Sequence, residues 1–220
     1  MKLSDSQMDV VGKLKAHIKN IFEKDASGHD WFHIERVYKN ALSIHKIEGG
    51  DLFIISLSAL LHDIADHKFN DDAQNLAIER IHSILIPLKV DQAIIDKVIY
   101  IVQNSSYKGG LANEMNCLEG LIVQDADRLD AIGAIGIART FAFGGKFNRL
   151  LYDPSIEPVT FKSLEELKTS KSHTINHFYE KLLKLKDGMH TKTGLAMAEQ
   201  RHVFMEQFLS QFFAEWNGKK

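Results

Sequence analysis

The sequence has little of what secreted and membrane proteins need. Its 220 residues contain one cysteine, Cys117, which excludes an internal disulfide framework and suits a reducing compartment. The first residues lack the apolar core of a signal peptide, and no apolar run approaches the length that spans a membrane. We therefore expect a cytoplasmic protein that has no membrane partner.

An excess of charge of one sign is also missing. The chain has 27 Lys and Arg against 29 Asp and Glu, a formal net charge of -2, and no block of basic residues. Proteins that bind duplex nucleic acid rely on many phosphate contacts, so we expect no double-stranded nucleic acid as main partner. A local basic pocket for small phosphates remains compatible with this balance. The apolar fraction of 45% is that of an ordinary globular protein.

Apolar residues recur at helical spacing along most of the chain, and this pattern predicts an all-α fold. We find no lasting strand alternation, internal repeat or linker, so we expect about nine helices in a single domain over residues 1–220, with a C-terminal helical extension. A loop is predicted at 143–146 and another at 152–158. The predicted helices cover residues 5–23, 30–48, the apolar segment around 52–66, 72–85, 91–103 and 116–141, the last with a bend at Gly133 or Gly136. Two further long helices are predicted where apolar residues form a stripe over 175–185 and over 198–216.

The apolar segment 52–65 contains one histidine-aspartate doublet, His62-Asp63. A helix that is apolar around most of its circumference is normally buried. Burying an imidazole and a carboxylate without partners is costly, and a metal ion would compensate that cost. On a continuous helix, Asp66 would project from the same face as the doublet.

Three motifs extend this interpretation. The segments 28–37, 59–66 and 123–130 resemble the motifs of the HD superfamily of metal-dependent phosphohydrolases, which is named after the doublet. The similarity is greatest to a bacterial subgroup of single-domain HD hydrolases, and includes 176–183 and 143–145. It implies one divalent ion held by His33, His62, Asp63 and Asp127, with Asp125 as the alternative to Asp127.

The residue types suit such an ion. Imidazole and carboxylate ligands fit Mn²⁺, Ni²⁺, Co²⁺, Fe²⁺ or Mg²⁺, and the absence of thiolate ligands disfavours structural zinc. Three further histidines raise the question of a second ion, but they match no position that dinuclear relatives use, and we therefore expect one ion. These histidines are His67, His82 and His173.

Two residues near the predicted ligands are candidates for catalysis. Arg36 lies one helical turn after His33 and is a candidate for holding a phosphate, or for pairing with a nearby carboxylate. Asp66 matches an acidic group that orients the attacking water in related enzymes, and its structural alternative is a surface carboxylate. Candidate substrate-binding residues, each of which a solvated surface or a local cap would also explain, are Lys108, Lys146, Asp130, His177 and Lys181.

The resemblance implies metal-dependent hydrolysis of a phosphate ester or anhydride, with a nucleotide as substrate. Because several basic residues suit several phosphates, we favour cleavage of a nucleoside triphosphate to the monophosphate and pyrophosphate. A nucleoside monophosphate phosphatase and a non-catalytic, nucleotide-binding HD regulatory module are the alternatives. A helical scaffold with a structural metal is disfavoured by the lack of cysteine ligands. We expect a monomer or a homodimer.

Overall fold

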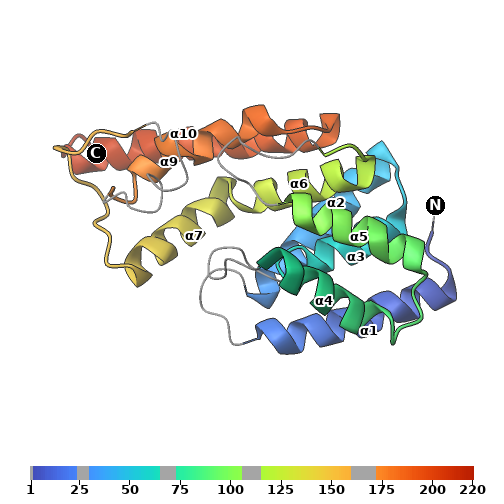
Figure 1. Cartoon of the computed structure of the whole chain (residues 1–220). Coiled ribbons are helices and arrows are strands. Elements are labelled where there is room, and N and C mark those ends of the chain that lie inside the picture. Colours follow the sequence, from blue (N-terminus) through green and yellow to red (C-terminus); the bar gives the residue numbers. More distant parts are fainter. Residues whose placement is uncertain (1, 24–29, 65–72, 106–114, 160–171) are drawn as a thin grey trace. The chain divides into compact units, whose positions relative to one another are not determined.

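The computed structural model describes residues 2–23, 30–64, 73–105, 115–159 and 172–220 (Figure 1). Within these ranges the regular elements are nine α-helices and one 3₁₀ helix, which confirms the predicted all-α fold. The chain divides into two compact units, Met1–Asp127 and Arg128–Lys220. The expected single domain over 1–220 stays a prediction. Among the described helices, none combines the length and apolar character that crossing a membrane requires.

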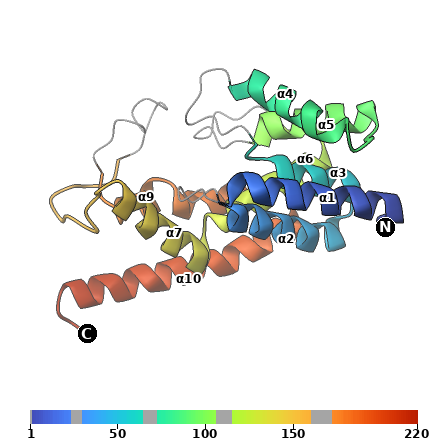
Figure 2. The same ribbon diagram turned by 90° about the horizontal axis from the view of Figure 1, so that it is seen from below.

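The first unit is built around one buried helix, α3. This helix contacts α1, α2 and α5, and Figure 2 shows it between the α1–α2 pair and the α4–α5 pair. Every residue of α3 except Leu52 is buried, as its largely apolar sequence predicts. The helices of this unit are α1 (Asp5–Phe22), α2 (Trp31–Glu48), α3 (Leu52–Leu61), α4 (Ala73–Leu85), α5 (Gln92–Ser105) and α6 (Leu118–Asp130), whose last turn belongs to the second unit.

Local signals set the ends of α2. The Asp30 carboxylate accepts a hydrogen bond of 2.8 Å from the backbone N–H of His33, which makes Asp30 the N-cap of α2. At the other end Gly49 has φ of +82°, a conformation that glycine adopts without strain. The N-cap therefore places His33 in the first turn of α2, with its backbone held by the cap.

Helix α3 is shorter than predicted and ends at Leu61, so the doublet follows the helix and does not lie inside it. Nδ1 of His62 lies 2.9 Å from the carbonyl oxygen of Ala59, which in a continuing helix would accept from the N–H of Asp63. This side chain competes with the backbone for the carbonyl and ends the regular pattern. Asp66 lies outside the described residues.

The second unit contains α7 (Gly133–Lys146), α9 (Asn176–Glu180), the 3₁₀ helix η1 (Leu182–Gly188) and α10 (Lys192–Trp216). Within this unit α7 packs against α10, and η1 contacts both α9 and α10 (Figure 1). The predicted helix 116–141 is broken into α6 and α7, and Gly133, at the start of α7, has φ of +74°. A flexible residue at the expected position therefore produces a break where a bend was predicted.

Two other predictions for this unit were wrong. Residues 143–146 form the last turn of α7 and not a loop. Gly144 serves close packing there and not a turn, since a Cβ atom at this position would overlap Oγ1 of Thr174. The long helix predicted around 175–185 is divided into α9 and η1 at Lys181, whose φ of -138° leaves the helical region.

Candidate metal centre

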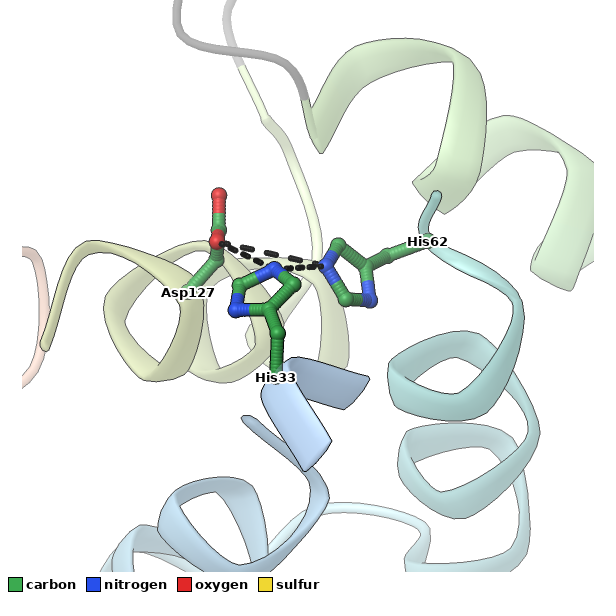
Figure 3. Close-up of side chains that lie close together, drawn as sticks. All are labelled: His33, His62 and Asp127. Carbon is green, nitrogen blue, oxygen red and sulfur yellow. Dashed lines mark hydrogen bonds and ion pairs between the residues drawn. The ribbon is translucent and has the colours of Figure 1, made fainter. Parts of the chain in front are cut away.

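Three side chains from separate segments of the first unit converge on one point. Figure 3 shows His33 at the start of α2, His62 after α3 and Asp127 on α6 turned toward one another. The Nε2 atoms of the two histidines are 3.2 Å apart, and Oδ1 of Asp127 lies 3.6 Å and 3.9 Å from them. One potential ligand atom of each residue lies within 4.8 Å of the others. This cluster is able to bind a metal ion.

Asp63 joins the same cluster from the residue next to His62. Its Oδ2 lies 3.3 Å from Nε2 of His33 and 3.5 Å from Nε2 of His62. Both imidazoles are buried, whereas the side chains of Asp63 and Asp127 are 17% and 32% exposed. The carboxylates therefore lie on the side of the cluster that reaches solvent, where a substrate would have access.

The protonation of His62 fits a metal ligand. Because a carbonyl oxygen only accepts, Nδ1 of His62 donates to Ala59, and the neutral ring in this tautomer has its lone pair on Nε2. A backbone carbonyl that orients a histidine in this way is a common feature around metal ligands. Two imidazole nitrogens and two carboxylates form a donor set for Mn²⁺, Fe²⁺, Co²⁺ or Ni²⁺.

Hydrogen bonds to the backbone hold the elements that carry the cluster. Asn40 on α2 donates 3.2 Å from Nδ2 to the carbonyl of Ala126, the residue before Asp127. Arg80 on α4 donates 2.7 Å from Nη1 to the carbonyl of Ile64, just after the doublet. Sequence reasoning missed both. The spacing of Asn40, two helical turns after His33, places it on the ligand-bearing face and is the one signal that was available.

The comparisons with known proteins identify the family. Residues 31–132 match the HD domain family. The protein YpgQ of Bacillus subtilis (strain 168) is 39% identical over 201 residues, which are 90% of each chain. The chain belongs to the HD domain family. A crystal structure of an HD-superfamily hydrolase from Bacillus thuringiensis is similar with a TM-score of 0.77 and 46% identity, over 96% of this chain and 98% of that one.

A second solved structure bears on ligands. YpgQ of Bacillus subtilis in complex with ADP is similar with a TM-score of 0.74 and 35% identity, over 93% of this chain and 97% of that one. The matched HD region contains all four residues of the cluster, since it runs from 31 to 132. The HD doublet itself is the pair that follows α3.

The other residues predicted in the HD region are only partly described. Arg36 lies one turn after His33 on α2 and is partly exposed. Asp125 is fully buried, and Asp127 supplies the carboxylate that approaches the histidines. Asp66, Lys108 and His67 lie outside the described residues. In the part of the chain that the structure describes, no second group of three or more potential ligands includes His82 or His173.

The remaining predicted residues belong to the second unit. Asp130 is buried, and its Oδ2 accepts a hydrogen bond of 2.9 Å from Nη1 of Arg139, so a structural ion pair is its visible role. Lys146 is exposed at the end of α7.

His177 and Lys181 lie one turn apart in this unit, since the N–H of Lys181 donates to the carbonyl of His177 at 3.0 Å. Burial, and then the positive charges of Lys181 and Arg149, lower the pKa of His177 from 6.5 to about 3. Its imidazole is therefore neutral at physiological pH. Sequence reasoning missed Arg149.

Proposed function

We propose that this protein is a metal-dependent phosphohydrolase that cleaves a nucleoside triphosphate to the monophosphate and pyrophosphate. The observation that carries the proposal is the convergence of His33, His62, Asp63 and Asp127 at distances that one ion can bridge. The likeness to an HD-superfamily hydrolase supports hydrolysis. The complex of YpgQ with ADP supports a nucleotide as ligand.

The four converging residues would hold one divalent ion. Such an ion supplies a Lewis acid for a phosphoryl oxygen and lowers the pKa of water toward neutrality. The chain contributes the geometry: the N-cap of α2 fixes His33, and the carbonyl of Ala59 fixes the ring of His62. Burial of both rings keeps competing water away from the nitrogen side of the site.

The proposed catalytic residues act on the phosphate and on the attacking water. Arg36 offers a fork of N–H donors to two phosphate oxygens. Asp66 orients the water and accepts its proton. Both roles follow from the position of these residues relative to His33 and to the doublet in the sequence.

The proposed substrate-binding residues neutralise the charge that develops on the phosphates. Lys108 and Lys146 supply cations, and His177 and Lys181 supply a neutral donor and a further cation. For Asp130, whose carboxylate already binds Arg139, we propose that it positions this arginine and does not contact substrate.

The reaction can be tested with a product-resolved assay. The protein is incubated with Mn²⁺ and with panels of nucleoside triphosphates and monophosphates, and free phosphate is measured with and without added inorganic pyrophosphatase. Phosphate that appears from triphosphates only when pyrophosphatase is present supports the proposal. Phosphate released directly from monophosphates would replace it with a monophosphatase.

Two variants show whether the measured phosphate release comes from this protein or from a contaminating enzyme. Asp127→Asn should strongly lower release, because it weakens the metal cluster. Asp9→Asn makes the same chemical change at an exposed ion pair with Lys13 and should leave activity unchanged. A protein that binds Mn²⁺ and nucleotides, yet releases no product from any of them, would be a binding module and would contradict the proposal.

A further inference from the structure

The chain after α7 is fastened to the start of α9 in the second unit. The N–H of Thr174 donates to the carbonyl of Leu150 at 2.9 Å, and the N–H of Ile175 donates to that of Leu151 at 3.1 Å. Oγ1 of Thr174 adds a third bond, 3.0 Å long, to the Leu150 carbonyl. Gly144 also lies against Thr174 without room for a side chain. The backbone just before Leu150 is therefore fixed relative to α9.

Arg149 occupies that fixed position. Its guanidinium carbon lies 5.6 Å from the ring centroid of Phe143, and the side chain is partly exposed. Within the described ranges, no carboxylate forms an ion pair with it. An aromatic ring attracts a guanidinium through its quadrupole and leaves the positive charge in place. Arg149 is thus held in a defined position with N–H groups and charge available to an anion.

A second cation and an imidazole lie at the same place in this unit. His177 is half-buried, its backbone N–H donates to the carbonyl of Thr174 at 3.2 Å, and Lys181 follows it by one turn. Burial is the largest cause of the low pKa of His177, and the positive charges of Lys181 and Arg149 add to it, so two cations lie near the ring. The imidazole remains neutral and offers an N–H without adding charge. A positive potential beside a neutral donor is an environment that favours an anion.

We infer that Arg149, Lys181 and the neutral imidazole of His177 form a phosphate-binding subsite in the second unit. The planar fork of Arg149 matches two oxygens of one phosphate, and Lys181 adds a point charge. The inference rests on the proposed function for its ligand, the phosphate groups of a nucleotide. Free inorganic phosphate or pyrophosphate offers the same chemistry.

Two aromatic rings favour the nucleotide as the source of that phosphate. Phe143 is 40% exposed and Phe147 is 51% exposed, and their ring centroids lie 4.5 Å apart. Exposed rings next to a phosphate-binding arginine give a base a surface on which to stack. Inorganic phosphate would make no use of them.

The subsite can be measured without the metal centre. Binding of pyrophosphate and of ADP is followed by calorimetry in excess EDTA, so that no divalent ion contributes. Arg149→Ala should weaken both by about tenfold to a hundredfold, the usual effect of losing charge-assisted hydrogen bonds. Arg149→Lys keeps the charge without the fork and should fall between. Lys184→Ala removes an exposed lysine of η1 and should bind as the wild type does.

The outcomes are distinct. Absence of pyrophosphate and ADP binding in EDTA, or equal affinity for wild type and Arg149→Ala with unchanged circular dichroism, overturns the inference. If Arg149→Ala fails to fold, Arg149→Lys and Lys181→Ala decide by the same comparison. If ADP binds more tightly than pyrophosphate, and Phe147→Ala reduces this difference, the subsite binds a nucleotide. If both bind with equal affinity and Phe147→Ala changes neither, the subsite binds free phosphate. Because the binding experiment does not measure turnover, it can contradict the subsite without contradicting the proposed reaction, and the hydrolysis assay can do the reverse.

Discussion

Metal binding should stabilise the fold through the four converging side chains. The two Nε2 atoms are only 3.2 Å apart, and Oδ2 of Asp63 lies 3.3 Å from one of them, so one ion could bind all three groups at once. An ion that binds only the folded state, at a hundred times its Kd, raises the free energy of unfolding by about 2.7 kcal/mol. In a chain of this size that corresponds to an increase of about 5–11 °C in Tm.

Asp127→Asn tests this reasoning because it removes a charge at nearly constant size. The side chain of Asp127 is 32% exposed, so the metal-free variant should stay folded. Losing a charged partner typically costs about 1.5–3 kcal/mol, or about tenfold to a hundredfold in Kd. At the same Mn²⁺ concentration the stabilisation then falls to about 0.4–1.4 kcal/mol. The expected increase in Tm is about 1–6 °C.

Thermal unfolding after dialysis against EDTA, repeated at increasing Mn²⁺, measures both values. Asp9→Asn is the matched control, since its carboxylate forms an exposed 2.7 Å ion pair with Lys13 and is not part of the cluster. This control should show the full wild-type increase. An Asp127→Asn protein that gains as much stability from Mn²⁺ as the wild type would refute the assignment of Asp127 as a ligand.

Four other changes address single residues. Asn40→Ala removes the hydrogen bond to the carbonyl beside Asp127, and should weaken Mn²⁺ binding by about 0.5–1.5 kcal/mol in calorimetry; lower stability with unchanged affinity would make its role purely structural. Arg36→Ala should raise KM about tenfold to a hundredfold and leave Mn²⁺ affinity intact, and wild-type kinetics would exclude a phosphate contact. Asp66→Ala should keep the ion and lower kcat by a factor of about 10² to 10⁴, whereas loss of the ion would make Asp66 a ligand. The folded pKa of His177, about 3, lies below its ordinary 6.5, so the unfolded chain binds a proton first and stability falls as pH drops through this window. His177→Gln should flatten that dependence of Tm on pH, and curves that stay parallel would contradict it.

Helices whose ends are set by neighbouring residues were predictable from sequence. The N-cap at Asp30 and the stop at Gly49 act through contacts within a few residues, and α2 begins and ends where these signals lie. The apolar spacing of α3 likewise predicted its burial. The second unit was harder, because Gly144 serves contact with Thr174, which is distant in sequence. A glycine that permits close packing and a glycine that makes a turn look the same in the sequence.

The candidate site follows the same division. The order of the three HD motifs predicted which residues converge, although nothing in their local spacing fixes the distances between α2, α3 and α6. Asn40 and Arg80 donate to backbone carbonyls, which every residue has. The residue types in the partner segments therefore could not have predicted these two contacts. Arg149 was missed for a related reason: its partner Phe143 is aromatic, and a search for opposite charge does not find it.

The position of the doublet after α3 gives a better account of His62 than burial inside a helix. The last four carbonyls of a helix lack intrahelical partners, and Ala59 supplies one of them. Nδ1–H of His62 satisfies that carbonyl, so one polar group of the buried ring is paired before any ion binds. The same bond fixes the tautomer whose Nε2 lone pair faces His33 and the two carboxylates. The end of the helix thus both accommodates the histidine and orients it as a ligand. An ion then has to compensate only the cost of burying the second ring nitrogen, Nε2.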